Sequence, residues 1–95
     1  MKTASRILAI VLMLGTNALA ADAPPGATAC SGCHATSAAA ETPVPRINGR
    51  AADETVSAMA DFRSGAKPST VMGRIAKGFT DDETKAIAAW LAAQK

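Results

Sequence analysis

The stretch ACSGCHAT, residues 29–36, contains both cysteines and the single histidine of this 95-residue chain. Cys30, Cys33 and His34 lie close together, and the remaining chain offers no further Cys or His. Thiolate and imidazole groups are the side chains that bind soft metals and take part in thiol chemistry. This concentration of reactive side chains predicts that the segment determines both how the chain folds and what the protein does.

The first residues follow the three-part pattern of a secretory signal peptide. Lys2 and Arg6 supply a positive start, and an uncharged, mostly apolar run follows. Ala18 and Ala20 suit the small-residue positions of a cleavage site. The apolar run is too short to span a bilayer well, since spanning takes roughly 20 apolar residues, although an uncleaved N-terminal anchor is the alternative. We expect cleavage after Ala20, which makes residues 1–20 a signal peptide.

Residues 21–95 are expected to form one small domain with little apolar material for a core. Lys2 and Arg6 account for the net charge of +2, so the mature domain is formally neutral. It lacks a basic stripe with interleaved aromatic residues, which excludes nucleic acid as an expected partner. Its aromatic residues are Phe62, Phe79 and Trp90. Domains this small usually need a disulfide, a metal or another staple, so a buried cofactor would supply the missing interior.

The segments on either side of the cysteines read mainly as irregular structure. Pro24 and Pro25 oppose regular structure at the mature N-terminus, although a short helix is expected to begin near Gly26 and to run into the cysteines. Residues 35–50 are expected to form a loop, because prolines and a glycine interrupt them. No stretch of the chain alternates apolar and polar residues for long enough to predict a strand.

A helix and a shorter helical turn are predicted after this loop. The spacing of apolar residues predicts a helix over 53–63, with Asp53 as its cap and Gly65 as its stop. Residues 71–78 are expected to form a short helical turn that ends at Gly78.

The last helix is predicted by a capping motif at its start. TDDE, residues 80–83, has the form of a capping box, in which Thr80 is the cap and Glu83 reaches back to it. Asp81 and Asp82 also suit the positive end of the helix dipole. The apolar residues that follow on one face are Ile87, Trp90 and Leu91.

Three structures are open to the sequence C-x-x-C-H. A disulfide between Cys30 and Cys33 is allowed after export, but it would close a short loop and stabilise the chain weakly. A structural zinc ion needs four ligands, whereas the chain offers fewer soft ones, too close together to surround it. Covalent haem attachment explains the whole pattern, because the thiols can reach the vinyl groups of one haem while the adjacent histidine lies below the iron. We therefore expect one haem c, attached through Cys30 and Cys33, with His34 as an iron ligand.

A haem iron held by His34 has a sixth position, for which the mature chain offers two methionines. Met59 lies on the apolar face of the helix expected over 53–63, where core packing accounts for it. Met72 follows Pro68 in a loop-like stretch, so packing on the apolar face of a helix does not account for it. A loop can place its sulfur on the side of the haem opposite His34. We expect Met72 to be the axial ligand. Met/His ligation raises the reduction potential, as suits an electron carrier.

The loop after the cysteines offers a partner for the other ring nitrogen of His34. A metal-binding histidine usually donates its second ring N–H to a carbonyl or a carboxylate. Pro45 has no N–H, but its carbonyl is free to accept, and we expect it to be this partner. Some basic residues could pair with haem propionates, although solvent exposure explains each of them as well. These are Arg46, Arg50, Arg74 and Lys77.

Together these features resemble a small class I cytochrome c. The resemblance is carried by CSGCH at 30–34, by PRING at 45–49, by the methionine loop and by the capped final helix. In that family a Pro-x-Leu/Ile-x-Gly stretch follows the haem site. The resemblance implies an all-α fold of three to four short helices wrapped around a covalently attached haem. It also implies that Pro45 supplies the carbonyl for His34 and that Met72 binds the iron.

A narrower resemblance is to the cytochrome subunit of flavocytochrome c sulfide dehydrogenase. STVMGRIAKGFTDDE at 69–83 is similar to the methionine loop of that subunit, and FRSG at 62–65 also fits it. The resemblance implies a periplasmic electron-transfer subunit, without a catalytic site of its own, that takes single electrons from a partner flavoprotein carrying FAD. Many such subunits have two haem domains, whereas this chain has one C-x-x-C-H. Ala35 and Thr36 also stand where a glycine often follows the histidine.

Two alternatives of other kinds stay open from the sequence. The chain could be a free soluble electron shuttle of a respiratory or sulfur-oxidation chain, without a dedicated flavoprotein partner. It could also be a secreted disulfide module without haem. A flavoprotein retained in stoichiometric amount would exclude the first alternative, and the colour of the purified protein decides the second.

Overall fold

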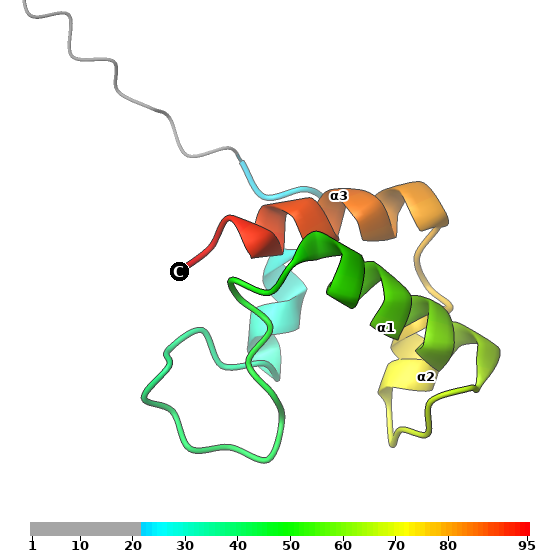
Figure 1. The fold of residues 1–95 in the computed structure, drawn as a ribbon, viewed down its shortest axis with the longest axis horizontal. Helices are drawn as coiled ribbons and strands as arrows, with labels where there is room; N and C mark the ends of the chain where they lie inside the picture. The colour runs from blue at the N-terminus through cyan, green and yellow to red at the C-terminus, as the bar shows by residue number, and fades with distance from the viewer. Residues whose placement is uncertain (1–21) are drawn as a thin grey trace, which may run out of the picture.

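A computed structural model describes residues 22–95, so the predicted signal peptide 1–20 lies outside the described residues. The described part contains a short 3-10 helix, η1 (Thr28–Gly32), followed by α1 (Ala52–Ser64), α2 (Met72–Ala76) and α3 (Asp81–Ala92) (Figure 1). Residues 22–95 contain no strand, which confirms the prediction of an all-α fold. None of the helices in this range has the length and apolar character that crossing a membrane requires.

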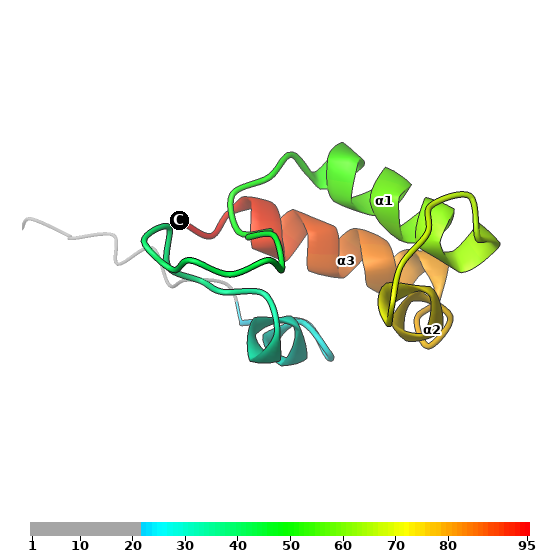
Figure 2. The ribbon, with the colours of Figure 1, turned by 90° about the horizontal axis from the view of Figure 1, so that it is seen from below.

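The helix α3 lies at the centre of the arrangement. Figure 2 shows α3 between α1 on one side and η1 on the other. In both views η1 and α2 lie on the same side of α3, towards its two ends. The helix α1 contacts both α2 and α3, whereas η1 and α2 make no helix-to-helix contact within the described residues. The elements that carry Cys30 and Met72 therefore do not contact each other.

The helix α1 ends as predicted but begins differently. Gly65 follows its last residue with φ 80°, a left-handed conformation that glycine adopts without steric cost, and its amide donates to the Phe62 carbonyl at 3.3 Å. The prediction of Asp53 as the cap is wrong, because Ala51 occupies the cap position without a side-chain bond. Asp53 instead lies in the first turn with Glu54, where carboxylates favour the positive end of the helix dipole.

The helix α2 corrects the expectation that Met72 lies in a loop. Met72 is the first residue of α2, which ends at Ala76, two residues before the predicted Gly78. The Ser69 hydroxyl accepts a hydrogen bond from the Gly73 amide at 2.8 Å, so a residue three positions before the helix satisfies one of its free N–H groups. This side-chain bond starts a helix in a sequence whose glycine and short length predict only a turn.

The helix α3 has the predicted capping box. The Thr80 hydroxyl accepts from the Glu83 amide at 3.2 Å, and the Glu83 carboxylate accepts from the Thr80 amide at 3.0 Å. Donation from the Thr80 backbone amide, followed by the Thr80 hydroxyl, lowers the pKa of the Glu83 carboxyl by stabilising its charged form. Ile87 and Leu91 are buried on the apolar face, and Trp90 is half-buried beside them.

The buried core is as thin as the composition predicts. Its buried hydrophobic residues are Ala27, Ala76, Ile87, Ala88 and Leu91. Ile87 and Leu91 are the large side chains in this set, and Ile47, Phe79 and Trp90 pack around them while partly exposed. Burying a Leu or Ile side chain contributes roughly 1.5–3 kcal/mol, so this set supplies little of the free energy that folding needs.

Replacement of Gly26 by Ala is expected to lower the free energy of unfolding by about 2 kcal/mol. Gly26 has φ 88°, and a Cβ built there would lie 2.6 Å from a ring carbon of Phe79. Thermal melting of the purified mature protein measures the change. Gly32→Ala is the matched control, because a Cβ at Gly32 meets no atom within 4 Å. Equal melting temperatures for both variants would contradict the expectation.

Candidate functional site

The element η1 brings Cys30, Cys33 and His34 onto one turn. Cys30 lies within η1, and the amides of Cys33 and His34 both donate to the Cys30 carbonyl, at 3.2 and 2.9 Å. Side chains three and four positions apart on such a turn are neighbours. Both thiols are free, and burial raises the pKa of the Cys30 thiol, whereas Cys33 is exposed. The turn therefore carries one half-buried thiol, one exposed thiol and one imidazole.

The structure also brings His34 and Pro45 together. His34 Nδ1 lies 2.5 Å from the carbonyl oxygen of Pro45. Since a carbonyl can only accept, Nδ1 carries the proton in this contact, and Nε2 of the neutral ring keeps its lone pair. A histidine held in this way has its orientation and tautomer fixed and one nitrogen ready for a metal.

The PRING stretch is anchored at alternate residues. Beyond Pro45, Ile47 packs against the buried core, and the Gly49 amide donates to the Leu91 carbonyl at 2.9 Å. Gly49 has φ 77°, and a Cβ there would lie 3.2 Å from the carbonyl oxygen of Gln94, so the close approach to the end of α3 favours glycine. The stretch thus fixes the Pro45 carbonyl by tying the residues after it to α3.

Arg46 is held within the loop rather than solvated. Its Nε donates to the carbonyl of Thr36 at 2.8 Å, and its side chain is half-buried. This bond joins the beginning and the end of the long loop that follows the cysteines. The interpretation that this basic side chain is simply solvated is therefore wrong for Arg46.

Apolar side chains are exposed on α2 and just before it. Val71 is 53% exposed and Ile75 is 43% exposed, and Met72 between them is half-buried. Large apolar side chains that gather on one exposed surface indicate a missing partner. The helix α2, which carries Met72 and Ile75, lies on the same side of α3 as η1 (Figure 1 and Figure 2).

Met59 lies in a different environment from Met72. It lines a groove of about 250 Å³ between α1 and α3, together with Val56, Thr84 and Lys85. Met59 is half-buried in this groove. Its position agrees with the interpretation that it packs between helices. The helix α1, which carries Met59, lies on the other side of α3 from η1 (Figure 2).

The donor set fits a haem better than a structural zinc ion. Within residues 22–95 no group of three or more His, Cys, Asp or Glu side chains could hold a metal ion, which argues against zinc. A covalently attached haem would need two free thiols, an imidazole with a free nitrogen and nearby apolar side chains. The residues that meet these needs are Cys30, Cys33, His34, Val71, Met72 and Ile75.

Arg63 is a residue whose role the sequence did not indicate. Its guanidinium donates to the carbonyls of Ala76 and Phe79 and forms an ion pair with Asp81 at 2.6 Å. These bonds tie the end of α1 to the segment between α2 and α3. No local pattern in the sequence FRSG, residues 62–65, specifies that Arg63 binds carbonyls more than ten residues away. Through this network Arg63 helps to fix α2, and hence Met72, relative to α1.

Two curated relatives support the predicted resemblance. The chain is 42% identical over 59 residues, or 62% of its length, to the cytochrome subunit of sulfide dehydrogenase from Chlorobaculum tepidum. It is 38% identical over an alignment of 93 residues, or 86% of its length, to the thiosulfate dehydrogenase electron acceptor of Stutzerimonas stutzeri. The predicted resemblance to such a cytochrome is confirmed, and a cytochrome relative implies a haem cofactor.

The chain spans about half the length of these relatives, since the alignments cover 54% of the first and 43% of the second. No family model matches the chain.

Proposed function

From the premise that the chain is a cytochrome c of the kind these relatives represent, we propose that it carries single electrons through one covalent haem in the periplasm. Cys30 and Cys33 would hold the haem through thioether bonds, and His34 and Met72 would bind its iron. The observation that carries the proposal is the contact of His34 Nδ1 with the Pro45 carbonyl, beside two free thiols on the same turn.

Each residue of the site has a definite task in this proposal. A bound haem would supply the one-electron redox couple. The Pro45 carbonyl orients the imidazole of His34, and the thioethers at Cys30 and Cys33 keep the group in place in both redox states. The apolar side chains of Val71 and Ile75 would exclude water from it. Ligation by both His34 and Met72 leaves no iron position for a substrate, so this chain would have no catalytic site of its own.

The support for Met72 comes from its position. Met72 lies between exposed apolar neighbours on the element that shares a side of α3 with η1, whereas Met59 lies in the groove between α1 and α3. A thioether ligand would need a sulfur held in a fixed position. The bonds of Ser69 to Gly73 and of Arg63 to Ala76 fix the helix that carries Met72.

The electron donor we propose is a sulfide-oxidising flavoprotein that carries FAD, with this chain as its electron-transfer subunit. Its support is the name of the first relative, a cytochrome subunit of sulfide dehydrogenase, together with the resemblance of residues 62–65 and 69–83. The second relative is an electron acceptor of thiosulfate dehydrogenase. That name favours a second candidate, a free soluble shuttle in sulfur-compound oxidation without a permanent flavoprotein.

The proposed location rests on the sequence of residues 1–20, which have the charged start, apolar run and small-residue site of a signal peptide.

Isolation of the protein from its native organism separates the two candidates. We expect the optical spectrum of a low-spin c-type cytochrome and, for the first candidate, a flavoprotein that stays bound in stoichiometric amount through size exclusion. A coloured cytochrome without flavin would overturn the first candidate in favour of the free shuttle. A colourless protein from a host able to mature c-type cytochromes would overturn both.

A further inference from the structure

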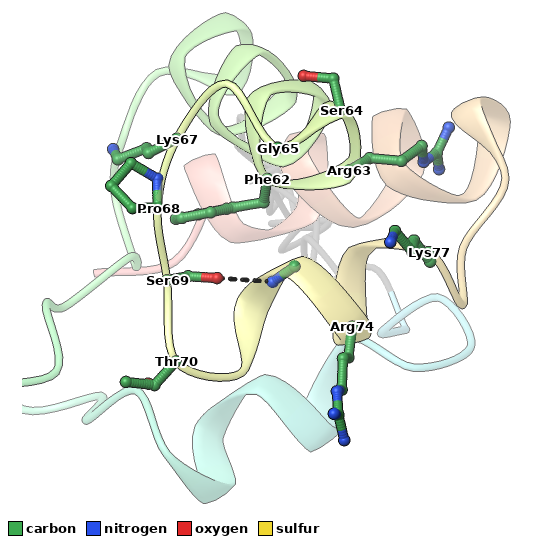
Figure 3. A pocket seen from close by; sticks show the side chains of 11 residues that line it. Phe62, Arg63, Ser64, Gly65, Lys67, Pro68, Ser69, Thr70, Arg74 and Lys77 are labelled. Atoms are coloured by element: carbon green, nitrogen blue, oxygen red, sulfur yellow. Dashed lines mark hydrogen bonds between the residues drawn. The ribbon is translucent and has the colours of Figure 1, made fainter.

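A basic hollow lies where α1 ends and α2 begins. It has a volume of about 390 Å³, and its wall includes the C-terminal turn of α1, the segment 65–70 and one side of α2. We call it the α1–α2 hollow. The residues that carry the argument are Phe62, Lys67, Ser69, Gly73, Arg74 and Lys77 (Figure 3). No acidic side chain lines it.

The charge of this region is one-sided, although the formal net charge of the mature domain is zero. The segment 62–77 contains four cations and no Asp or Glu. Arg63 is paired with Asp81, but the structure gives Arg74 and Lys77 no ion pair within residues 22–95. The Lys67 ammonium lies 5.3 Å from the centre of the Phe62 ring, a cation–π contact that leaves its charge uncompensated. Three exposed positive charges therefore surround the hollow.

The directions of these cations indicate the size of what they could bind. In Figure 3 the side chains of Lys67, Arg74 and Lys77 point in different directions around the hollow rather than towards one point within it. A small anion is held by donors that converge on it, whereas an extended acidic surface is met by charges spread around a patch. The arrangement favours a protein surface that bears several carboxylates.

The hollow also adjoins the proposed electron path. Gly73 lines it, and Gly73 follows Met72 on α2. A partner seated on the hollow would therefore lie next to the residue that we assign to the iron. Resting on the proposed electron-transfer function, we propose that the α1–α2 hollow is the docking surface for the carboxylate-rich face of a redox partner protein.

The proposal can be tested with the haem-loaded protein on a gold electrode coated with a carboxylate-terminated monolayer, which stands in for the acidic partner. At low ionic strength the wild-type protein should adsorb and exchange electrons with the electrode. The double variant Lys67→Glu, Lys77→Glu should lose about tenfold or more of its electroactive coverage, the lower end of what electrostatic steering contributes to association. Raising the salt should remove wild-type adsorption as well.

The matched control is the double variant Lys85→Glu, Lys95→Glu, which changes the net charge equally at exposed positions outside the hollow. It should retain most of the coverage. An equal loss in both double variants, or no loss in either, would overturn the docking surface. Solution spectra and potentials of all variants are recorded first. A protein without a haem redox couple in solution refutes the proposed function. Normal spectra, together with adsorption that does not differ between the two double variants, refute the docking surface alone.

Discussion

Replacement of both Cys30 and Cys33 by Ser is expected to leave the mature chain without a cooperative unfolding transition. The variant would lack the covalent haem, and the core that remains has Ile87 and Leu91 as its large buried side chains. Their burial offsets only a small part of the conformational entropy of the chain, which costs roughly 1–2 kcal/mol per residue. The exposed Val71 and Ile75 would stay in water without the group that covers them.

Near-ultraviolet circular dichroism and calorimetry measure this effect. We expect fluctuating tertiary packing with some residual helix, and no heat absorption peak. Ser31→Ala is the control, because Ser31 is exposed on the same turn between the two cysteines and should retain the haem and the melting transition. A sharp calorimetric transition in the double-serine variant would show that the polypeptide folds without its cofactor.

Replacement of Met72 by Ala is expected to remove the weak red absorption band of sulfur-ligated ferric haem and to lower the reduction potential. The potential should fall by more than about 0.1 V, a fraction of the roughly 0.8 V over which axial ligands set haem potentials. The thioethers at Cys30 and Cys33 are unchanged in this variant, so the haem should stay attached. Optical spectra of the ferric protein and a redox titration provide the two readouts.

Met59→Ala is the matched control for the axial ligand. Because Met59 is half-buried in the groove between α1 and α3, its truncation should cost about 1–2 kcal/mol of stability and leave the red band in place. If the band survives in Met72→Ala and disappears in Met59→Ala, the two methionines have the opposite roles and α2 does not supply the ligand.

The parts of the fold that could be predicted from sequence are those that depend on neighbouring residues. The capping box of Thr80 and Glu83 lies within one turn, so its pattern is visible in four letters. Gly65 ends α1 because its own left-handed conformation suits the position. The sequence predicts a contact of His34 with the Pro45 carbonyl, and in the structure His34 Nδ1 contacts the Pro45 carbonyl oxygen.

The features that could not be predicted depend on residues far apart in the chain. The start of α2 at Met72 depends on the Ser69 hydroxyl and on bonds from Arg63 to Ala76 and Phe79, neither of which leaves a periodic pattern. The cap of α1 is Ala51, two residues before the predicted Asp53, so Asp53 lies in the first turn. The sequence did not predict that the side chains of Val71 and Ile75 are exposed, because exposure depends on how distant elements pack.

Mass analysis of the mature protein tests the central claim most directly. The protein should be produced in a host able to mature c-type cytochromes and digested so that Cys30 and Cys33 stay on one peptide. We predict that this peptide carries the added mass of one haem and that neither sulfur reacts with a thiol reagent. A peptide of unmodified mass with two reactive thiols, or with a disulfide between them, would contradict the account.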